Sequence, residues 1–267
     1  MAGRWWTKFY MWKVVSSQVT GASHLKTNLS CQDRVAYEAL PGCALVAAVA
    51  DGAGSAQMAE LGAEIAANFV IAHLKHSLTE KRSDFAACLR EAAALAREAI
   101  AFEAGREKAP MRSYATTLLA LVLTPEGGGA LQLGDGLIVV SDCWDEWSWV
   151  FWPQRGEYIN TTHFLTDDDA MERLEIDILP GALTDVALMS DGLEPLALHY
   201  ATRAIHVPFL NGIFRPLFKA KGSEDLRKLS TSLQKFLSSE VVGSRTDDDL
   251  SLLLATRRND DESQLCD

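Results

Sequence analysis

The sequence lacks the features that would tie the chain to a membrane, a disulfide framework or nucleic acid. It has five cysteines in 267 residues and no CxxC pair. This odd, scattered set indicates reduced thiols in a cytoplasmic protein. No run of about 18 apolar residues is free of charge, so we expect no transmembrane helix. The net charge of −11 argues against nucleic acid and against an anionic membrane as partners.

The N-terminal segment MAGRWWTKFYMWKVV also lacks the features of a signal peptide. It is aromatic and basic, but it has neither a long apolar core nor a small-residue cleavage site. A chain of this length buries about 70–75% of its unfolded surface, which is enough to fold without disulfides. We expect a single domain over residues 1–256, a short polar insert at about 153–181, and a disordered tail at 257–267.

Apolar periodicity predicts long helices alternating with groups of strands. The predicted helices span residues 56–78, 83–104 and 223–238. The predicted strands span residues 12–20, 34–40, 43–50, 115–123, 130–141, 146–152, 185–195 and 247–256. Between them, we expect a polar loop at 21–34 and a hairpin turn at EGGG, residues 126–129. Several strands follow one another without a helix between them, which favours an α+β fold with antiparallel sheets.

Four acidic residues stand beside apolar strands. Asp51, Asp135 and Asp191 are each followed by glycine, and Asp248 belongs to an acidic run before the last strand. Asp135, between two glycines in LQLGDGLIVV, is expected at the bend of a hairpin. A strand that stops at an aspartate places a carboxylate at the edge of a rigid core, where several such groups can converge on one cation. Hard divalent ions prefer oxygen ligands, often one or two carboxylates with water.

Other interpretations of these acids remain open from spacing alone. A lone Asp-Gly pair is usually only a turn. The stretch GAGSAQ is similar to a dinucleotide-binding fingerprint, but Gln57 occupies the place of its third glycine. An acid also precedes its first glycine, where a small or apolar residue is usual. Both departures disfavour a Rossmann site.

The order of the motifs resembles the type 2C family of metal-dependent serine/threonine protein phosphatases, the PPM family, in a bacterial-like form. The resemblance spans residues 12–256. It rests on Asp33 in CQDR, Asp51-Gly52 in ADGAGS, Thr116-Thr117 in YATTLLALV, Gly134-Asp135 in LGDGLIVV, Ser190-Asp191-Gly192 in LMSDGLE, and Asp248-Asp249 in TDDDLSLLL.

This resemblance implies an α-β-β-α sandwich of two antiparallel sheets flanked by helices, with two divalent ions, Mn²⁺ or Mg²⁺, at one end. By motif match, Asp51 bridges both ions and the Gly52 carbonyl holds one of them. Asp191 and Asp248 hold the other ion, Asp33 supports the cluster, and Asp135 serves a third, weaker ion. Asp51 and Asp191 are thus the expected catalytic residues.

The implied reaction is hydrolysis of phosphoserine and phosphothreonine on proteins by a metal-activated water, without a phosphoenzyme. The expected partners are a phosphoprotein substrate and a serine/threonine kinase whose action the enzyme reverses. The polar segment 153–181 occupies the place of the family's variable flap.

The chain departs from the family pattern at three positions, one of which is Gln32, where glutamate usually precedes the first acid. Asn28 stands where members often have a phosphate-gripping arginine, and Ala53 stands where eukaryotic members have histidine. His24 is a nearby cation and a candidate substrate-binding residue, although a histidine in a polar loop is more often simply solvated. The alternative function is a catalytically weak, phosphatase-like binding or regulatory module.

Overall fold

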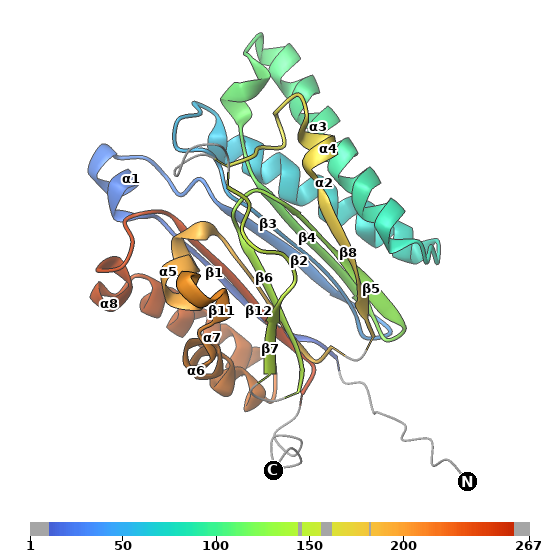
Figure 1. Cartoon of the computed structure of the whole chain (residues 1–267), viewed down its shortest axis with the longest axis vertical. Coiled ribbons are helices and arrows are strands. Elements are labelled where there is room, and N and C mark those ends of the chain that lie inside the picture. The colour runs from blue at the N-terminus through green and yellow to red at the C-terminus, as the bar shows by residue number, and fades with distance from the viewer. Residues whose placement is uncertain (1–10, 144–145, 156–161, 182, 259–267) are drawn as a thin grey trace.

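The computed structural model describes residues 11–143, 146–155, 162–181 and 183–258. Two five-stranded antiparallel sheets pack face to face, and helices cover the outer face of each sheet (Figure 1). The expected α-β-β-α sandwich is therefore confirmed. In the described part of the chain, no helix is long and apolar enough to cross a membrane.

The two sheets have different strand orders. The first runs β2 (Arg34–Leu40), β3 (Ala44–Ala50), β4 (Leu118–Thr124), β5 (Gly127–Leu133) and β8 (Glu175–Pro180). The second runs β1 (Lys13–Val19), β12 (Leu250–Thr256), β9 (Asp185–Met189), β6 (Leu137–Cys143) and β7 (Glu146–Trp149). A separate two-stranded ribbon pairs β10 (Leu198–His199) with β11 (Ala204–Ile205).

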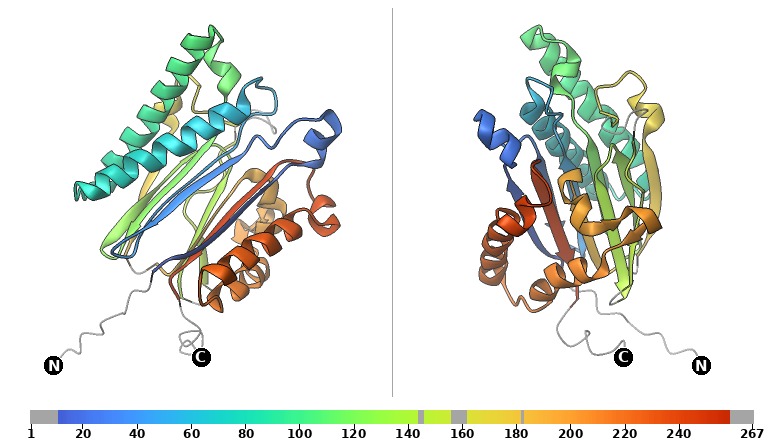
Figure 2. Two further views of the ribbon diagram at one scale, coloured as in Figure 1. Left: turned by 180° about the vertical axis from the view of Figure 1, so that it is seen from behind. Right: turned by 60° about the vertical axis from the view of Figure 1, so that its left-hand side comes forward.

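Long helices form the two outer layers (Figure 2). Helices α2 (Ala59–Thr79) and α3 (Phe85–Glu107) cover the first sheet, while α6 (Val207–Phe218) and α7 (Ser223–Leu237) cover the second. The short helices are α1 (Ala22–Thr27), η1 (Met111–Tyr114), α4 (Ala170–Arg173), η2 (Asp191–Leu193), α5 (Glu194–Ala197), η3 (Tyr200–Thr202) and α8 (Glu240–Gly243). Buried alanines on α2 and α3 let both helices pack closely on the sheet.

Strand β3 shows why the apolar runs of this sequence do not alternate with polar residues. All seven of its residues are buried. Val46 and Ala48 belong to the core under α2 and α3, whereas Leu45 and Ala47 belong to the core between the two sheets. Both faces of the strand are covered, so both must be apolar.

The structure corrects two expectations around the glycine-rich segments. The hairpin between β4 and β5 turns at residues 125–126, and Gly127–Gly129 lie inside β5. A Cβ on Gly129 would come within 2.8 Å of Leu89 Cδ1 on α3, so close helix packing explains the glycine there. The predicted strand 130–141 with its hairpin bend at Asp135 is also wrong. Strands β5 and β6 belong to different sheets, and residues 134–136 cross between them.

Other differences concern polar segments. The predicted loop 21–34 contains α1, and α6 was not expected from the sequence. The segment 153–181 was expected to be irregular, but Glu175–Pro180 forms the edge strand β8. Residues 156–161 of that segment lie outside the described residues. Arg257 and Arg258, expected in a disordered tail, are buried because they bind Leu183 and Asp185. The rest of that tail, 259–267, is not described.

Candidate active site

Strand register brings the predicted acids to one end of the sandwich. Arg34 pairs with Ala50, so β2 begins where β3 ends. Met189, at the end of β9, pairs with Leu252 near the start of β12 and with Leu137 at the start of β6. The acids that flank these five strand ends form what we call the acid cluster: Asp33, Asp51, Asp135, Asp191 and Asp248.

The threonine pair fixes the backbone at Asp51. The Asp51 N–H donates to Thr117 Oγ1 at 3.0 Å, and the Thr117 N–H donates to the Asp51 carbonyl at 2.8 Å. The Thr116 hydroxyl donates to the same carbonyl at 3.0 Å. At Gly52, a Cβ would lie 2.8 Å from the carbonyl oxygens of Ala59 and Gln32, so no side chain fits. The loop after β3 is thus held in one conformation.

Asp33, which is buried, and Asp51, which is half-buried, form the centre of the cluster. Asp33 is fully buried, and neither of its carboxylate oxygens has a hydrogen-bond partner in the described part of the chain. Burial raises the pKa of Asp33 to about 7. The neighbouring side chains of Asp51 and Ser190 lower this pKa, but each by less than burial raises it. Burial also raises the pKa of Asp51 well above its ordinary value, and the charges of Asp33 and Asp191 add to that rise.

The remaining acids surround this centre. Burial raises the pKa of Asp191, and its Oδ1 is buried without a hydrogen-bond partner among the described residues. Burial and then the charge of Asp191 raise the pKa of Asp135 to about 7. Asp248 stands at the exposed rim, where partial desolvation and then the charge of Asp191 raise its pKa. Several carboxylates thus lie close enough to raise one another's pKa values, which favours a bound cation.

Asp249 has a different environment from its neighbour Asp248. It is buried, accepting hydrogen bonds from the N–H groups of Gly21 at 2.7 Å and Gln32 at 2.6 Å. Its Oδ2 also lies 2.9 Å from His24 Nδ1. Asp249 therefore ties the chain before β12 to the segments on both sides of α1. Sequence reasoning gave it no separate role, because its partners are distant in the chain.

His24 lies beside this cluster and packs against its neighbours. One ring nitrogen faces Asp249, and Nε2 lies 3.7 Å from where a Cβ on Gly54 would stand. The ring therefore packs between the segment that precedes β12 and the ADGAGS loop. Substrate binding by His24 stays a prediction.

A second polar group, missed from the sequence, adjoins the acids. Glu194 is buried in α5, and burial raises its pKa to about 7. The Tyr200 hydroxyl donates a hydrogen bond to Glu194 Oε2. Arg155 Nη2 lies 3.4 Å from that same oxygen, and its guanidinium stacks on the Tyr200 ring. Only the position of Glu194, directly after the SDGL motif, signalled this group in the sequence.

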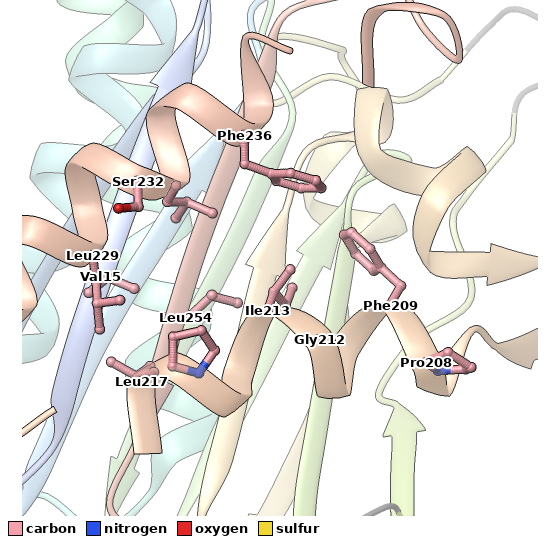
Figure 3. A pocket seen from close by; sticks show the side chains of 12 residues that line it. Val15, Pro208, Phe209, Gly212, Ile213, Leu217, Leu229, Ser232, Phe236 and Leu254 are labelled. Atoms are coloured by element: carbon pink, nitrogen blue, oxygen red, sulfur yellow. The ribbon is translucent and has the colours of Figure 1, made fainter. Parts of the chain in front are cut away.

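An apolar groove lies elsewhere, between α6, α7 and the outer face of the second sheet. Figure 3 shows Phe209 and Ile213 of α6 and Phe236 of α7 around it, with Val15 and Leu254 from the sheet. Its volume is about 380 Å³ and its lining contains no titratable side chain. The groove therefore cannot supply acid-base or metal chemistry, and the acid cluster is the candidate active site.

The side chains of the acid cluster do not form a complete set of metal ligands. Across the described residues, no group of three or more His, Cys, Asp or Glu side chains is placed so that it could hold an ion by itself. Any cation here would need further oxygen ligands from the backbone or from water. Magnesium sites in proteins commonly have this composition.

Known proteins share both the sequence and the fold. A family model described as Protein phosphatase 2C matches residues 20–238. Serine/threonine-protein phosphatase 3 of Escherichia coli K12 is 36% identical over 249 residues, which cover 91% of this chain and 98% of that protein. This curated relative and the family model agree over most of the chain.

Two solved structures have the same fold at low sequence identity. A bacterial serine phosphatase superposes with a TM-score of 0.64 at 15% identity, covering 94% of this chain and 99% of that one. The serine/threonine phosphatase PstP/Ppp of Mycobacterium tuberculosis gives 0.59 at 16% identity, covering 93% and 100%. Together with the sequence matches, these findings show that the chain is a phosphoprotein phosphatase belonging to the protein phosphatase 2C family.

Proposed function

We propose that this phosphatase is metal-dependent and hydrolyses phosphoserine and phosphothreonine on proteins at the acid cluster. The observation that carries the proposal is the set of buried carboxylate oxygens without partners. Both oxygens of Asp33 and Oδ1 of Asp191 are buried and unbonded among the described residues. Buried charges are retained in proteins when they are paired or coordinate metal ions, and a divalent cation fits this donor set.

The residues that would hold the cations are those of the motifs. Asp51 and the Gly52 carbonyl, with Asp191 and Asp248, would supply the ligands, and Asp33 would support them from beneath. Asp135 would serve a third, weaker ion. Bound Mn²⁺ or Mg²⁺ would acidify a water molecule for attack on phosphorus and neutralise charge on the phosphoryl oxygens.

The chain's own residues prepare this site. Thr116 and Thr117 hold the Asp51 carbonyl and amide, so the carboxylate after β3 projects from a fixed backbone. Asp249 holds the segment from which Asp248 projects. Such preorganisation limits the reorganisation needed when substrate binds.

A catalytically weak binding module remains the second candidate, because of Ala53. This residue is buried and packs against Ala56, Ala59 and Ala115, so the position after Gly52 offers no proton donor. An alkyl leaving group needs more help from a proton donor than an aryl one does. A binding module would keep the acid cluster and lose turnover.

The test is hydrolysis of p-nitrophenyl phosphate and of a phosphothreonine peptide, each with Mn²⁺, with Mg²⁺ and with EDTA. We expect metal-dependent turnover of both substrates, lost in Asp191→Asn. The matched control is Asp168→Asn, which changes an exposed acid. If the folded protein binds metal but turns over neither substrate, the binding module becomes the better account.

Two broader proposals follow from this activity. The enzyme would act in the cytoplasm, supported by the free thiols of Cys31 and Cys88 in the described part of the chain. There it would oppose a serine/threonine kinase. Phosphoproteomes from cells with and without the active enzyme would identify the phosphorylation sites it removes; unchanged phosphoserine and phosphothreonine levels would contradict this role.

A further inference from the structure

Among the described residues, the basic side chains near the acid cluster are His24, Arg34 and Arg155, and Arg34 is bound elsewhere. His24 faces Asp249. Arg34 donates to Glu60 on α2 and to the Asp33 carbonyl. The His24 ring also lowers the pKa of the rim residue Asp248. Arg155 acts on more of the acids, because its positive charge lowers the pKa values of Asp135, Asp191 and Glu194.

The backbone before Arg155 is locked onto the turn that carries Asp135. The Gln154 N–H donates to the Gly134 carbonyl at 3.2 Å, and the Gly134 N–H donates back to Gln154 Oε1 at 2.8 Å. Gln154 Nε2 also donates to Glu175 Oε2 at 2.9 Å. The reciprocal pair fixes Arg155 beside Asp135, although Arg155 lies outside any helix or strand.

The side chain of Arg155 is held in one orientation but keeps N–H groups available for a ligand. Its guanidinium carbon lies 4.8 Å from the centroid of the Tyr200 ring, within the range of a cation–π interaction. Its Nη2 lies 3.4 Å from Glu194 Oε2, longer than the roughly 2.7–2.9 Å of a strong charge-assisted hydrogen bond. The side chain is 45% exposed, so part of its donor set faces solvent.

We propose that Arg155 binds the phosphoryl oxygens of the phosphorylated side chain, and of the inorganic phosphate product, with Tyr200 and Glu194 as its positioning residues. This proposal rests on the function proposed above. A phosphate dianion approaching several carboxylates is repelled unless a cation receives it. The planar fork of arginine matches two phosphate oxygens at once.

The test compares Arg155→Gln and Arg155→Lys with wild type, and Arg203→Gln is the matched control. Arg203 is also an exposed arginine over an aromatic ring, 5.5 Å from the Trp152 centroid. We expect Arg155→Gln to raise KM for the phosphothreonine peptide and the inhibition constant of inorganic phosphate, each by about 10- to 100-fold. Arg155→Lys should recover part of both losses, and Arg203→Gln should change neither.

Tyr200→Phe tests the positioning role. It keeps the ring under the guanidinium and removes the hydroxyl that binds Glu194. We expect a KM increase of several-fold with kcat nearly unchanged. A Tyr200→Phe enzyme with wild-type KM and phosphate inhibition would remove Tyr200 and Glu194 from the proposal.

Direct titration of the metal-loaded protein with inorganic phosphate separates this inference from the proposed function. If wild type shows no metal-dependent hydrolysis, the proposed function fails, and phosphate binding alone still reports on Arg155. If wild type is active but Arg155→Gln has wild-type KM and phosphate affinity, the Arg155 inference is overturned. Circular dichroism of each variant establishes that it is folded.

Discussion

At the residue scale, two adjacent aspartates have opposite tasks. Asp248 is exposed at the rim of the acid cluster, whereas Asp249 is buried and accepts hydrogen bonds from the backbone at Gly21 and Gln32. Asp249→Ala leaves both buried N–H groups without an acceptor. We expect the free energy of unfolding to fall by about 2–4 kcal/mol. Urea denaturation measures this, with Asp247→Ala, a change at the exposed neighbour, as the control. Equal urea midpoints for the two variants would show that the hydrogen bonds of Asp249 do not stabilise the fold.

Glu194 predicts the pH dependence of the metal-free protein. Tyr200, Arg155, Asp191 and Asp135 face this carboxyl, and burial raises its pKa from 4.5 to about 7. The folded protein therefore keeps the Glu194 proton at pH values where the unfolded chain has lost it. This contribution is complete below pH 4.5 and disappears as the pH rises towards 7.

The measurement is urea denaturation in EDTA at a series of pH values. Between pH 4.5 and 7, Glu194→Gln should lose about 2 kcal/mol less stability than wild type. The control is Glu126→Gln, at an exposed residue in the turn between β4 and β5. Its stability should change with pH as that of wild type does. Parallel wild-type and Glu194→Gln curves would show that this carboxyl does not bind its proton more tightly in the folded state.

How far the sequence predicts the site depends on the range of each contact. Asp51 and Asp191 are recognisable because an apolar strand precedes each and glycine follows. Asp249 and Arg155 are not recognisable in this way. Their partners lie far along the chain: Gly21 is 228 residues from Asp249, and Glu194 is 39 residues from Arg155. Local pattern identifies the carboxylates but not the residues that orient them.

At the element scale, the close contact between α2 and η1 depends on one glycine. A Cβ on Gly62 would stand 2.1 Å from the Tyr114 carbonyl oxygen, whereas a Cβ on Gly105 of α3 would meet nothing within 4 Å. We expect Gly62→Ala to destabilise the protein by about 2 kcal/mol or more, because backbone must move. Gly105→Ala should stabilise it by about 0.5–1 kcal/mol through helix propensity. The unfolding temperatures of the two variants test this prediction. A Gly62→Ala protein as stable as wild type would contradict the close contact between α2 and η1.

The elements themselves were predicted unevenly. Helices α2, α3 and α7 follow from apolar periodicity, which is a local property. The crossing at residues 134–136 could not be distinguished from a hairpin, because nothing in LQLGDGLIVV says that its two strands join different sheets. Gly134 has a φ of 106° and a Cβ there would meet Thr117 Cγ2 at 2.6 Å. Thr117 lies opposite Gly134 because Leu118 of β4 pairs with Leu133 of β5, and the local sequence does not specify that pairing.

At the scale of the whole molecule, the two sheets act as a frame that brings like charges together. Acids flank β2 and β3 of the first sheet and β6, β9 and β12 of the second. Strand pairing aligns these strand ends within each sheet, and the packing of the two sheets brings the acids together at one end. Folding therefore places mutually repelling carboxylates close to one another, and the metal-free protein carries that cost. A ligand that binds the folded state and relieves the repulsion must stabilise the entire chain.

Mn²⁺ or Mg²⁺ should accordingly raise the unfolding temperature of the wild-type protein. At a free metal concentration a hundredfold above Kd, the gain is about 2.7 kcal/mol per site. Asp191→Asn removes a carboxylate with a buried, unbonded oxygen, so its metal-free form should be no less stable and its gain from metal should be much smaller. Asp168→Asn should gain as much as wild type. Equal gains in all three proteins would mean that cations bind elsewhere on this acidic surface, and the acid cluster would then lose its assignment as the metal site.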